Sequence, residues 1–242
     1  MKLAILFAII ILAQAIETAL GFGSTVFSLG IGSYFMPIKE LVVVLVMIAW
    51  LQALFIVVRA FKHIRWRILL TRILLFAGMG LPVGIWFYRH FAGEQLKIVF
   101  GIFIVAASLN ELWSLWRKKG KLKPLPLPLG ILVLILGGFV HGIFASGGPL
   151  IVIYSCRELP DKSSFRATMS ALWLVLNSAL LISFLVSHQV RPADYQTALI
   201  LLPALVIGIL VGEILHHKVN EFIFKIVIQF ILLLTGVFML IR

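Results

Sequence analysis

Two short glycine-rich stretches place polar groups inside otherwise apolar sequence. The first, residues 17–32, contains a carboxylate, four glycines and several hydroxyls, and the second, residues 141–149, begins with a histidine. An offset of 124 residues aligns the two stretches, so that Glu17 corresponds to His141. Unpaired backbone groups cost several kcal/mol in hydrocarbon, so a broken helix is tolerated there only where protein or a polar cavity covers it. The two stretches are therefore predicted to form a site.

The backbone at these breaks is the first candidate for binding a ligand. A helix N-terminus carries free N–H donors and about half a positive charge, so half-helices that begin near Gly23 and Gly147 would hold an anion. Hydroxyl groups close to the breaks add further donors. The simpler alternative is that the small residues only allow close helix packing. The predicted substrate-binding residues are Gly21, Gly23, Ser24, Thr25, His141, Ser146, Gly147, Gly148 and Asn177.

Glu17 and His141 are the strongly titratable groups within the two stretches. An ionisable residue within a membrane indicates a functional role, and the charge of a histidine changes near neutral pH. Both residues are therefore candidates for proton coupling, and the alternative is a protonated Glu17 and a packed His141 without such a role. The other histidines show no spacing typical of a metal site, so neither a metal nor a cofactor is predicted.

The composition of the chain places these polar groups in a membrane protein. Of its 242 residues, 62% are hydrophobic and 12% are charged, whereas a soluble domain is roughly half apolar and a quarter charged. The formal net charge is +12, and the basic residues lie mostly between apolar runs. This distribution is typical of loops retained in the cytoplasm and not of a nucleic-acid-binding surface. We expect a multi-pass protein of the cytoplasmic membrane.

Eight apolar segments are expected to be helical, and six of them have the length of one membrane span. The segments cover residues 3–35, 40–61, 68–88, 95–116, 129–156, 167–187, 193–215 and 222–241. The first and the fifth segment carry the glycine breaks and are too long for one span. Each is expected to form either two arms that meet at the glycines or one long broken helix.

The distribution of lysine and arginine favours the two-arm form, in which both segments are re-entrant hairpins. With hairpins, 15 basic residues lie on one side of the membrane and 6 on the other, whereas eight full crossings give 13 and 8. The unequal distribution of lysine and arginine between the two sides sets the orientation of a membrane protein. The hairpin form, with the larger difference between the two sides, is therefore preferred. In the hairpin alternative Arg191 lies opposite the basic residues of 59–72, and with eight crossings it lies on their side.

A basic linker rich in proline, residues 117–128, divides the chain into two similar halves, residues 1–116 and 129–242. Each half would contain one glycine-broken segment and three transmembrane helices, and a Gly-x3-Gly pattern recurs at corresponding positions, Gly80 and Gly208. An odd number of crossings in each half would invert the second half, as in many secondary transporters. The predicted fold class is an all-α polytopic membrane protein with two inverted repeats.

Four motifs recur together in this chain. They are Leu20-Gly21-Phe22-Gly23-Ser24, Ser146-Gly147-Gly148-Pro149, the pattern of Pro203, Gly208 and Gly212, and the polar approach Leu159-Pro160-Asp161-Lys162 with Phe165-Arg166-Ala167-Thr168. In their order and spacing they resemble the sulfite exporter TauE/SafE family of membrane permeases over essentially the whole chain. The resemblance implies movement of sulfur-containing anions, such as sulfite and sulfonates, across the cytoplasmic membrane.

The predicted function is that of a secondary transporter which binds a small anion near the midplane, between the two glycine breaks. Its partners would be the anionic substrate and the lipid bilayer, with a homodimer as an option and no nucleic acid. A nucleotide-binding Gly-x4-Gly-Lys-Ser/Thr loop is missing from the sequence, so direct use of a nucleotide is not expected. Two alternatives are a membrane-embedded enzyme with Ser24 as nucleophile and His141 as base, and an assembly protein that transports nothing.

Overall fold

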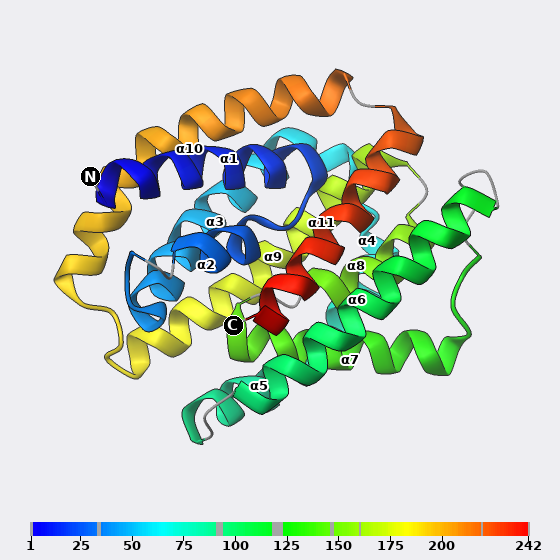
Figure 1. Cartoon of the computed structure of the whole chain (residues 1–242), viewed down its shortest axis with the longest axis horizontal. Helices are drawn as coiled ribbons and strands as arrows, with labels where there is room; N and C mark the ends of the chain where they lie inside the picture. Colours follow the sequence, from blue (N-terminus) through cyan, green and yellow to red (C-terminus); the bar gives the residue numbers. More distant parts are fainter. Residues whose placement is uncertain are drawn as a thin grey trace. The chain divides into compact units, whose positions relative to one another are not determined.

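The computed structural model describes residues 2–32, 35–90, 94–117, 123–145, 148–159, 161–218 and 220–241. All regular elements in this part of the chain are helical (Figure 1). The α-helices are α1 (Lys2–Leu20), α2 (Ser24–Gly32), α3 (Ile38–Ala60), α4 (Trp66–Ile68), α5 (Leu74–His90), α6 (Glu94–Arg117), α7 (Leu127–Phe144), α8 (Gly148–Glu158), α9 (Lys162–Val186), α10 (Pro192–Lys218) and α11 (Glu221–Ile241). A 3-10 turn, η1 (Phe61–His63), follows α3, and a π-helical turn, η2 (Leu69–Ile73), joins α4 to α5.

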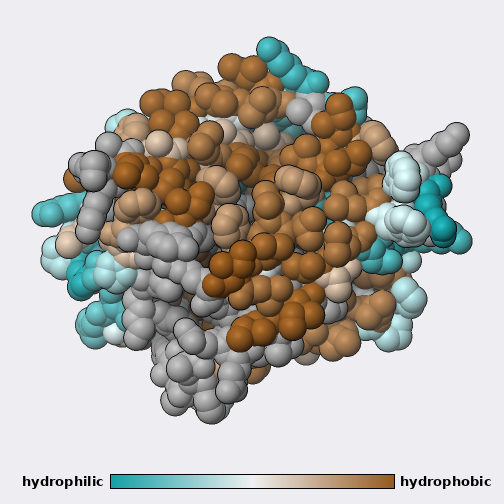
Figure 2. All heavy atoms as spheres, viewed as in Figure 1, coloured by the Kyte–Doolittle hydropathy of each residue, from teal (hydrophilic) through white to brown (hydrophobic). Residues whose placement is uncertain are grey.

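Four helical stretches of the described residues are long and apolar enough to cross a membrane: Glu40–His63, Trp66–Phe87, Lys162–Val186 and Pro192–Lys218. Each of the eight expected apolar segments contains a helix, and the first and fifth contain two each. Hydrophobic residues cover most of the surface seen in Figure 2, as expected for contact with lipid. The prediction of an all-α polytopic membrane protein is confirmed, and the repeat arrangement stays a prediction.

The chain divides into two compact units, and each unit combines segments from both halves of the sequence. Unit 1 comprises Met1–Trp66 and Arg166–Lys218, and unit 2 comprises Arg67–Phe165 and Val219–Arg242. Unit 1 therefore holds α1, α2, α3, α10 and most of α9. Contact units and sequence repeats are different properties, so the predicted division at the linker 117–128 stays a prediction.

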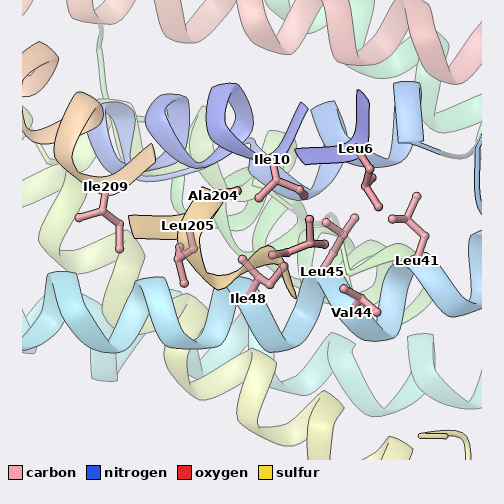
Figure 3. Packing of buried hydrophobic residues seen from close by; sticks show 10 residues of the cluster. Leu6, Ile10, Leu41, Val44, Leu45, Ile48, Ala204, Leu205 and Ile209 are labelled. Carbon is pink, nitrogen blue, oxygen red and sulfur yellow. The ribbon is translucent and has the colours of Figure 1, made fainter. Parts of the chain in front are cut away.

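The core of unit 1 is formed by α1, α3 and α10 (Figure 3). Its buried residues are Leu6, Ile10, Leu41, Val44, Leu45, Ile48, Leu201, Ala204, Leu205 and Ile209. Glycines on α10 bring α1 close: a Cβ on Gly208 would lie 2.7 Å from the Gln14 Cβ, and one on Gly212 would lie 2.6 Å from the Ala15 oxygen. Small residues of this kind let the backbones of membrane helices approach each other.

Unit 2 contains the same kind of packing between α5 and α7. A Cβ on Gly142 of α7 would lie 2.5 Å from the Leu81 oxygen of α5, and Gly80 and Gly84 of α5 face backbone atoms of α7. Helix α11 packs along α6 in the same unit. In both units, therefore, a Gly-x3-Gly helix packs against the helix that precedes a glycine break.

Each glycine-broken segment folds as a helical hairpin. In the first, a Cβ on Gly32 of α2 would lie 3.4 Å from the Leu6 Cδ1 of α1. In the second, a Cβ on Gly137 of α7 would lie 2.5 Å from the Ile151 Cγ1 of α8. In the first hairpin the contacting residues lie far from the break on both arms, and in the second Gly137 contacts the first turn of α8, so both segments fold as two arms that pack against each other. Entry and exit of these hairpins on one side of the bilayer stays a prediction.

The helix ends of unit 1 are grouped as the hairpin alternative requires. Arg191, which precedes α10, pairs with Glu40 at the start of α3 at 2.9 Å. At the opposite end of α3, the Arg65 N–H donates to the Thr168 hydroxyl of α9 at 3.0 Å. Eight full crossings would have placed Arg191 on the same side as Arg65.

Candidate functional site

The break between α1 and α2 depends on two glycines. Gly21 and Gly23 have φ angles of 89° and 108°, a conformation that costs glycine little and other residues much. The Gly21 N–H closes the last turn of α1 by donating to the backbone carbonyl oxygen of Glu17 at 2.6 Å. A Cβ on Gly21 would also lie 2.9 Å from the Arg166 Cα of α9. Gly21 is therefore required both by its backbone angle and by the neighbouring helix.

The carboxylate of Glu17 occupies the N-terminus of α2. The Ser24 N–H donates to the Glu17 Oε2 at 3.0 Å, and the Ser24 hydroxyl donates to the same oxygen. Both side chains are buried, with 5% of Glu17 and 1% of Ser24 exposed. A negative group is favoured at a helix N-terminus. The Ser24 N–H and hydroxyl, which are predicted to bind an anion, thus donate to the protein's own carboxylate, and their role in substrate binding stays a prediction.

The carbonyl groups at the end of α1 accept hydrogen bonds from side chains of α9 and α10. The contacts are Arg166 Nη1 to the Thr18 oxygen at 3.1 Å, His216 Nδ1 to the Ala19 oxygen at 2.8 Å, and Trp173 Nε1 to the Gly21 oxygen at 2.8 Å. The last carbonyls of a helix lack partners within it, so these three side chains fix the end of α1 at the break.

Two further polar contacts complete this part of unit 1. Arg166 forms an ion pair with Glu213 of α10, with 2.8 Å between Nη1 and Oε1. Gln52 of α3 donates to the Gln14 oxygen at 2.7 Å and to the Thr18 hydroxyl at 2.5 Å. Side chains of α3, α9 and α10 therefore meet around the last turns of α1, close to Glu17.

The first break lies closer to the ends of its neighbouring helices than to their middles. Gly21 contacts Arg166, one turn after α9 begins, and Ala19 contacts His216, close to the end of α10. The 19 residues of α1 form a rod of about 28 Å at 1.5 Å per residue, and a bilayer core is about 30 Å thick. The first arm therefore has about the length of one membrane crossing, and the midplane position of the break stays a prediction.

The helix before the second break ends in a similar way to α1. Ala145 has a φ of 50°, and its N–H donates to the backbone carbonyl oxygen of His141 at 2.8 Å. The Gly21 N–H donates to the backbone carbonyl oxygen of Glu17 in the same way. His141 is buried, and Gly148, also buried, begins α8. The predicted residues Ser146 and Gly147 lie outside the described residues.

Unit 1 brings together Glu17, Gly21, Gly23 and Ser24 of the predicted site. Thr25 follows Ser24 on α2 and is half-buried, and Asn177 is buried on α9, one turn beyond Trp173. His141 and Gly148 belong to unit 2. Among the described residues, no group of three or more His, Cys, Asp or Glu could hold a metal ion.

Four side chains surround the break from other helices and are not among the predicted site residues: Arg166, Trp173, His216 and Gln52. Arg166 lies just before the expected apolar segment 167–187, where an arginine ordinarily extends to the membrane interface, so its sequence position gives a weak signal. His216 stands beside His217 at a helix end, where a histidine is usually solvated. No spacing rule connects it to Ala19, almost 200 residues earlier.

Helical hairpins with glycine breaks beside long apolar spans are typical of membrane transport proteins. The family model described as Sulfite exporter TauE/SafE matches residues 6–239, and the chain belongs to this family. It is therefore a multi-pass membrane protein of a transport family, as the motifs predict. Searches of curated proteins and of solved structures found no match.

Proposed function

We propose that the protein is a secondary transporter of small sulfur-containing anions, such as sulfite or a sulfonate, in the cytoplasmic membrane. The family supports the class of substrate. The observation that carries the proposal is the Glu17 carboxylate on the Ser24 N–H and hydroxyl. Donors that hold a carboxylate oxygen also suit an oxygen of sulfite, because both are charged acceptors of similar size.

In this proposal Glu17 is an internal competitor of the substrate. When Glu17 takes up a proton it loses its charge, and its hold on Ser24 weakens. The substrate anion then replaces it on the same donors, so binding of one anion is linked to uptake of one proton. His141, at the corresponding position of the second hairpin, is proposed as a second coupling residue.

The second hairpin is proposed to supply further substrate contacts, from Ser146, Gly147 and Gly148, with Thr25 and Asn177 as polar contacts in unit 1. The positive φ angles at Gly21 and Ala145, each with an N–H bonded to the backbone oxygen four residues earlier, support two related hairpins, which we propose to be inverted repeats. The enzyme alternative requires Ser24 to hand its proton to His141. In the structure the Ser24 hydroxyl donates to Glu17 instead.

The test is the binding of sulfite and of methanesulfonate to the purified protein. Ser24→Ala removes one donor of the proposed site and should raise the Kd about tenfold, the usual effect of losing one charge-assisted hydrogen bond. Ser187→Ala is the control, because its hydroxyl bonds only to backbone oxygens at the end of α9. An unchanged Kd in Ser24→Ala would place the substrate elsewhere.

A further inference from the structure

Arg166 of α9 is a buried cation that lies against the tip of the first hairpin. Only 7% of the residue is exposed, and its Nη1 contacts both the Thr18 oxygen and Glu213. Its Nε is buried without a hydrogen-bond partner. A guanidinium has five N–H donors in a fixed fork, so Arg166 keeps a donor for another acceptor. A charge inside a transmembrane segment is costly and marks substrate pathways.

The charges around Arg166 come from the helices packed against it. Glu213 of α10 is its partner at 2.8 Å, and Arg59 at the end of α3 is close enough to act on it electrostatically. His217 lies 3.8 Å from the second oxygen of Glu213. Glu213 is thus the carboxylate that balances a predominantly basic end of unit 1.

The two strongest anion-binding groups at this break are both held by carboxylates of the chain itself. Glu17 holds the Ser24 N–H and hydroxyl, and Glu213 holds Arg166. We propose that Arg166 binds the substrate anion and that Glu213 is the internal carboxylate which the anion replaces. This inference rests on the proposed function and adds the cationic contact and its competitor to that site.

Replacing one anionic hydrogen-bond acceptor of a buried arginine by another costs little free energy. Losing its partner would leave an uncompensated buried charge, which is strongly destabilising. A sulfite or sulfonate oxygen that arrives as Glu213 leaves keeps the charge balanced and the hydrogen bonds made. The planar fork of arginine also matches two oxygens of one anion. Glu213 is then free to pair with His217 at the end of the same helix.

The exchange and a purely structural ion pair predict opposite effects of removing Glu213. If Glu213 competes with the substrate, Glu213→Gln removes the competitor and the substrate binds more tightly. If the pair only joins α9 to α10, Glu213→Gln loosens the site and the substrate binds equally or more weakly. Removing Arg166 weakens binding in both cases, so Glu213 decides between them.

The experiment measures the Kd for sulfite and for methanesulfonate with the purified full chain and its variants. Glu213→Gln should lower the Kd roughly tenfold, and Arg166→Gln should raise it at least tenfold. These factors correspond to the usual free energy of one charge-assisted hydrogen bond. Arg166→Lys should fall between parent and Arg166→Gln, because it keeps the charge without the fork.

Arg191→Gln is the matched control at the other end of α10. Arg191 also pairs with carboxylates, and its hydrogen bonds to Glu40 and Asp194 raise the pKa of its guanidinium. It lies far along α10 from the break, so its loss should leave the Kd unchanged.

The outcomes separate the two proposals. If the parent binds neither anion, the proposed function fails. If the parent binds and Glu213→Gln does not bind more tightly, the function stands and the inference is overturned. Should Arg166→Gln fail to fold, Glu213→Gln still decides, because a destabilised site cannot account for tighter binding.

Discussion

At the scale of single residues, the first break depends on groups that perform two tasks at once. Glu17 caps α2 through Ser24, and the same contact keeps the anion donors occupied. The type and place of Glu17 could be predicted from the sequence, because a carboxylate in an apolar segment is conspicuous. Its hydrogen-bond partner, Ser24, could not be predicted, because a turn with two positive φ angles brings Ser24 back to Glu17.

The role of Glu17 predicts how binding depends on pH. A charged Glu17 competes with the anion, so the Kd of the parent should fall as the pH is lowered and Glu17 takes up protons. Glu17→Gln imitates the protonated form and should show a lower Kd with a flatter pH profile from about pH 5.5 to 8, the range around an ordinary histidine. His141→Gln should flatten the profile as well.

The control for this pH series is Glu40→Gln, which removes a carboxylate that pairs with Arg191 at the other end of unit 1. It should keep the parent's profile. If Glu17→Gln and His141→Gln both keep that profile too, the two residues are structural and proton coupling lies elsewhere.

The glycine at position 21 gives a second prediction at this scale. Gly21→Ala combines an unfavourable φ with a collision against α9, and should lower the stability by about 1–3 kcal/mol. Gly78→Ala is the matched control, since a Cβ there meets nothing within 4 Å and alanine favours a helix by about 1 kcal/mol over glycine. Thermal unfolding in detergent measures both. Equal melting temperatures for the two variants would contradict the role given to Gly21.

At the scale of elements, the sequence predicted the helices better than their contacts. The eight apolar runs and the two breaks are visible as hydrophobicity and glycine content, and each run does contain a helix. The partners of α1 were not predictable, because α10 lies in the other half of the chain. The Gly-x3-Gly patterns marked a close contact, and the structure shows that the contacting helix is α1 for Gly208 and α7 for Gly80.

At the scale of the whole molecule, the contacts between helix ends in unit 1 agree with the predicted hairpin topology, which stays a prediction. Arg191 lies with Glu40, and Arg65 lies with Thr168, as two re-entrant hairpins require. The excess of lysine and arginine predicts that the end with Arg65 faces the cytoplasm. The tip of the first hairpin lies near the start of α9, because Gly21 contacts Arg166, so the same prediction puts the tip towards the cytoplasm.

This orientation predicts the accessibility of single cysteines in a Cys156→Ser background. Lys62→Cys and Lys218→Cys should react with a membrane-impermeant thiol reagent only from the cytoplasmic side, and Gln189→Cys only from the outside. With eight crossings, residues 62 and 189 would share a side. Labelling of Lys62→Cys and Gln189→Cys from the same side of sealed vesicles would therefore refute the hairpin topology.

The most direct test of the central claim is the flux of labelled sulfite through proteoliposomes that contain the purified protein. The expected result is a saturable flux that methanesulfonate inhibits and that an imposed pH gradient drives. Ser24→Ala should strongly reduce this flux at unchanged protein insertion. Proteoliposomes with correctly folded parent protein that pass sulfite and methanesulfonate no faster than protein-free vesicles, with the pH gradient in either direction, would contradict it.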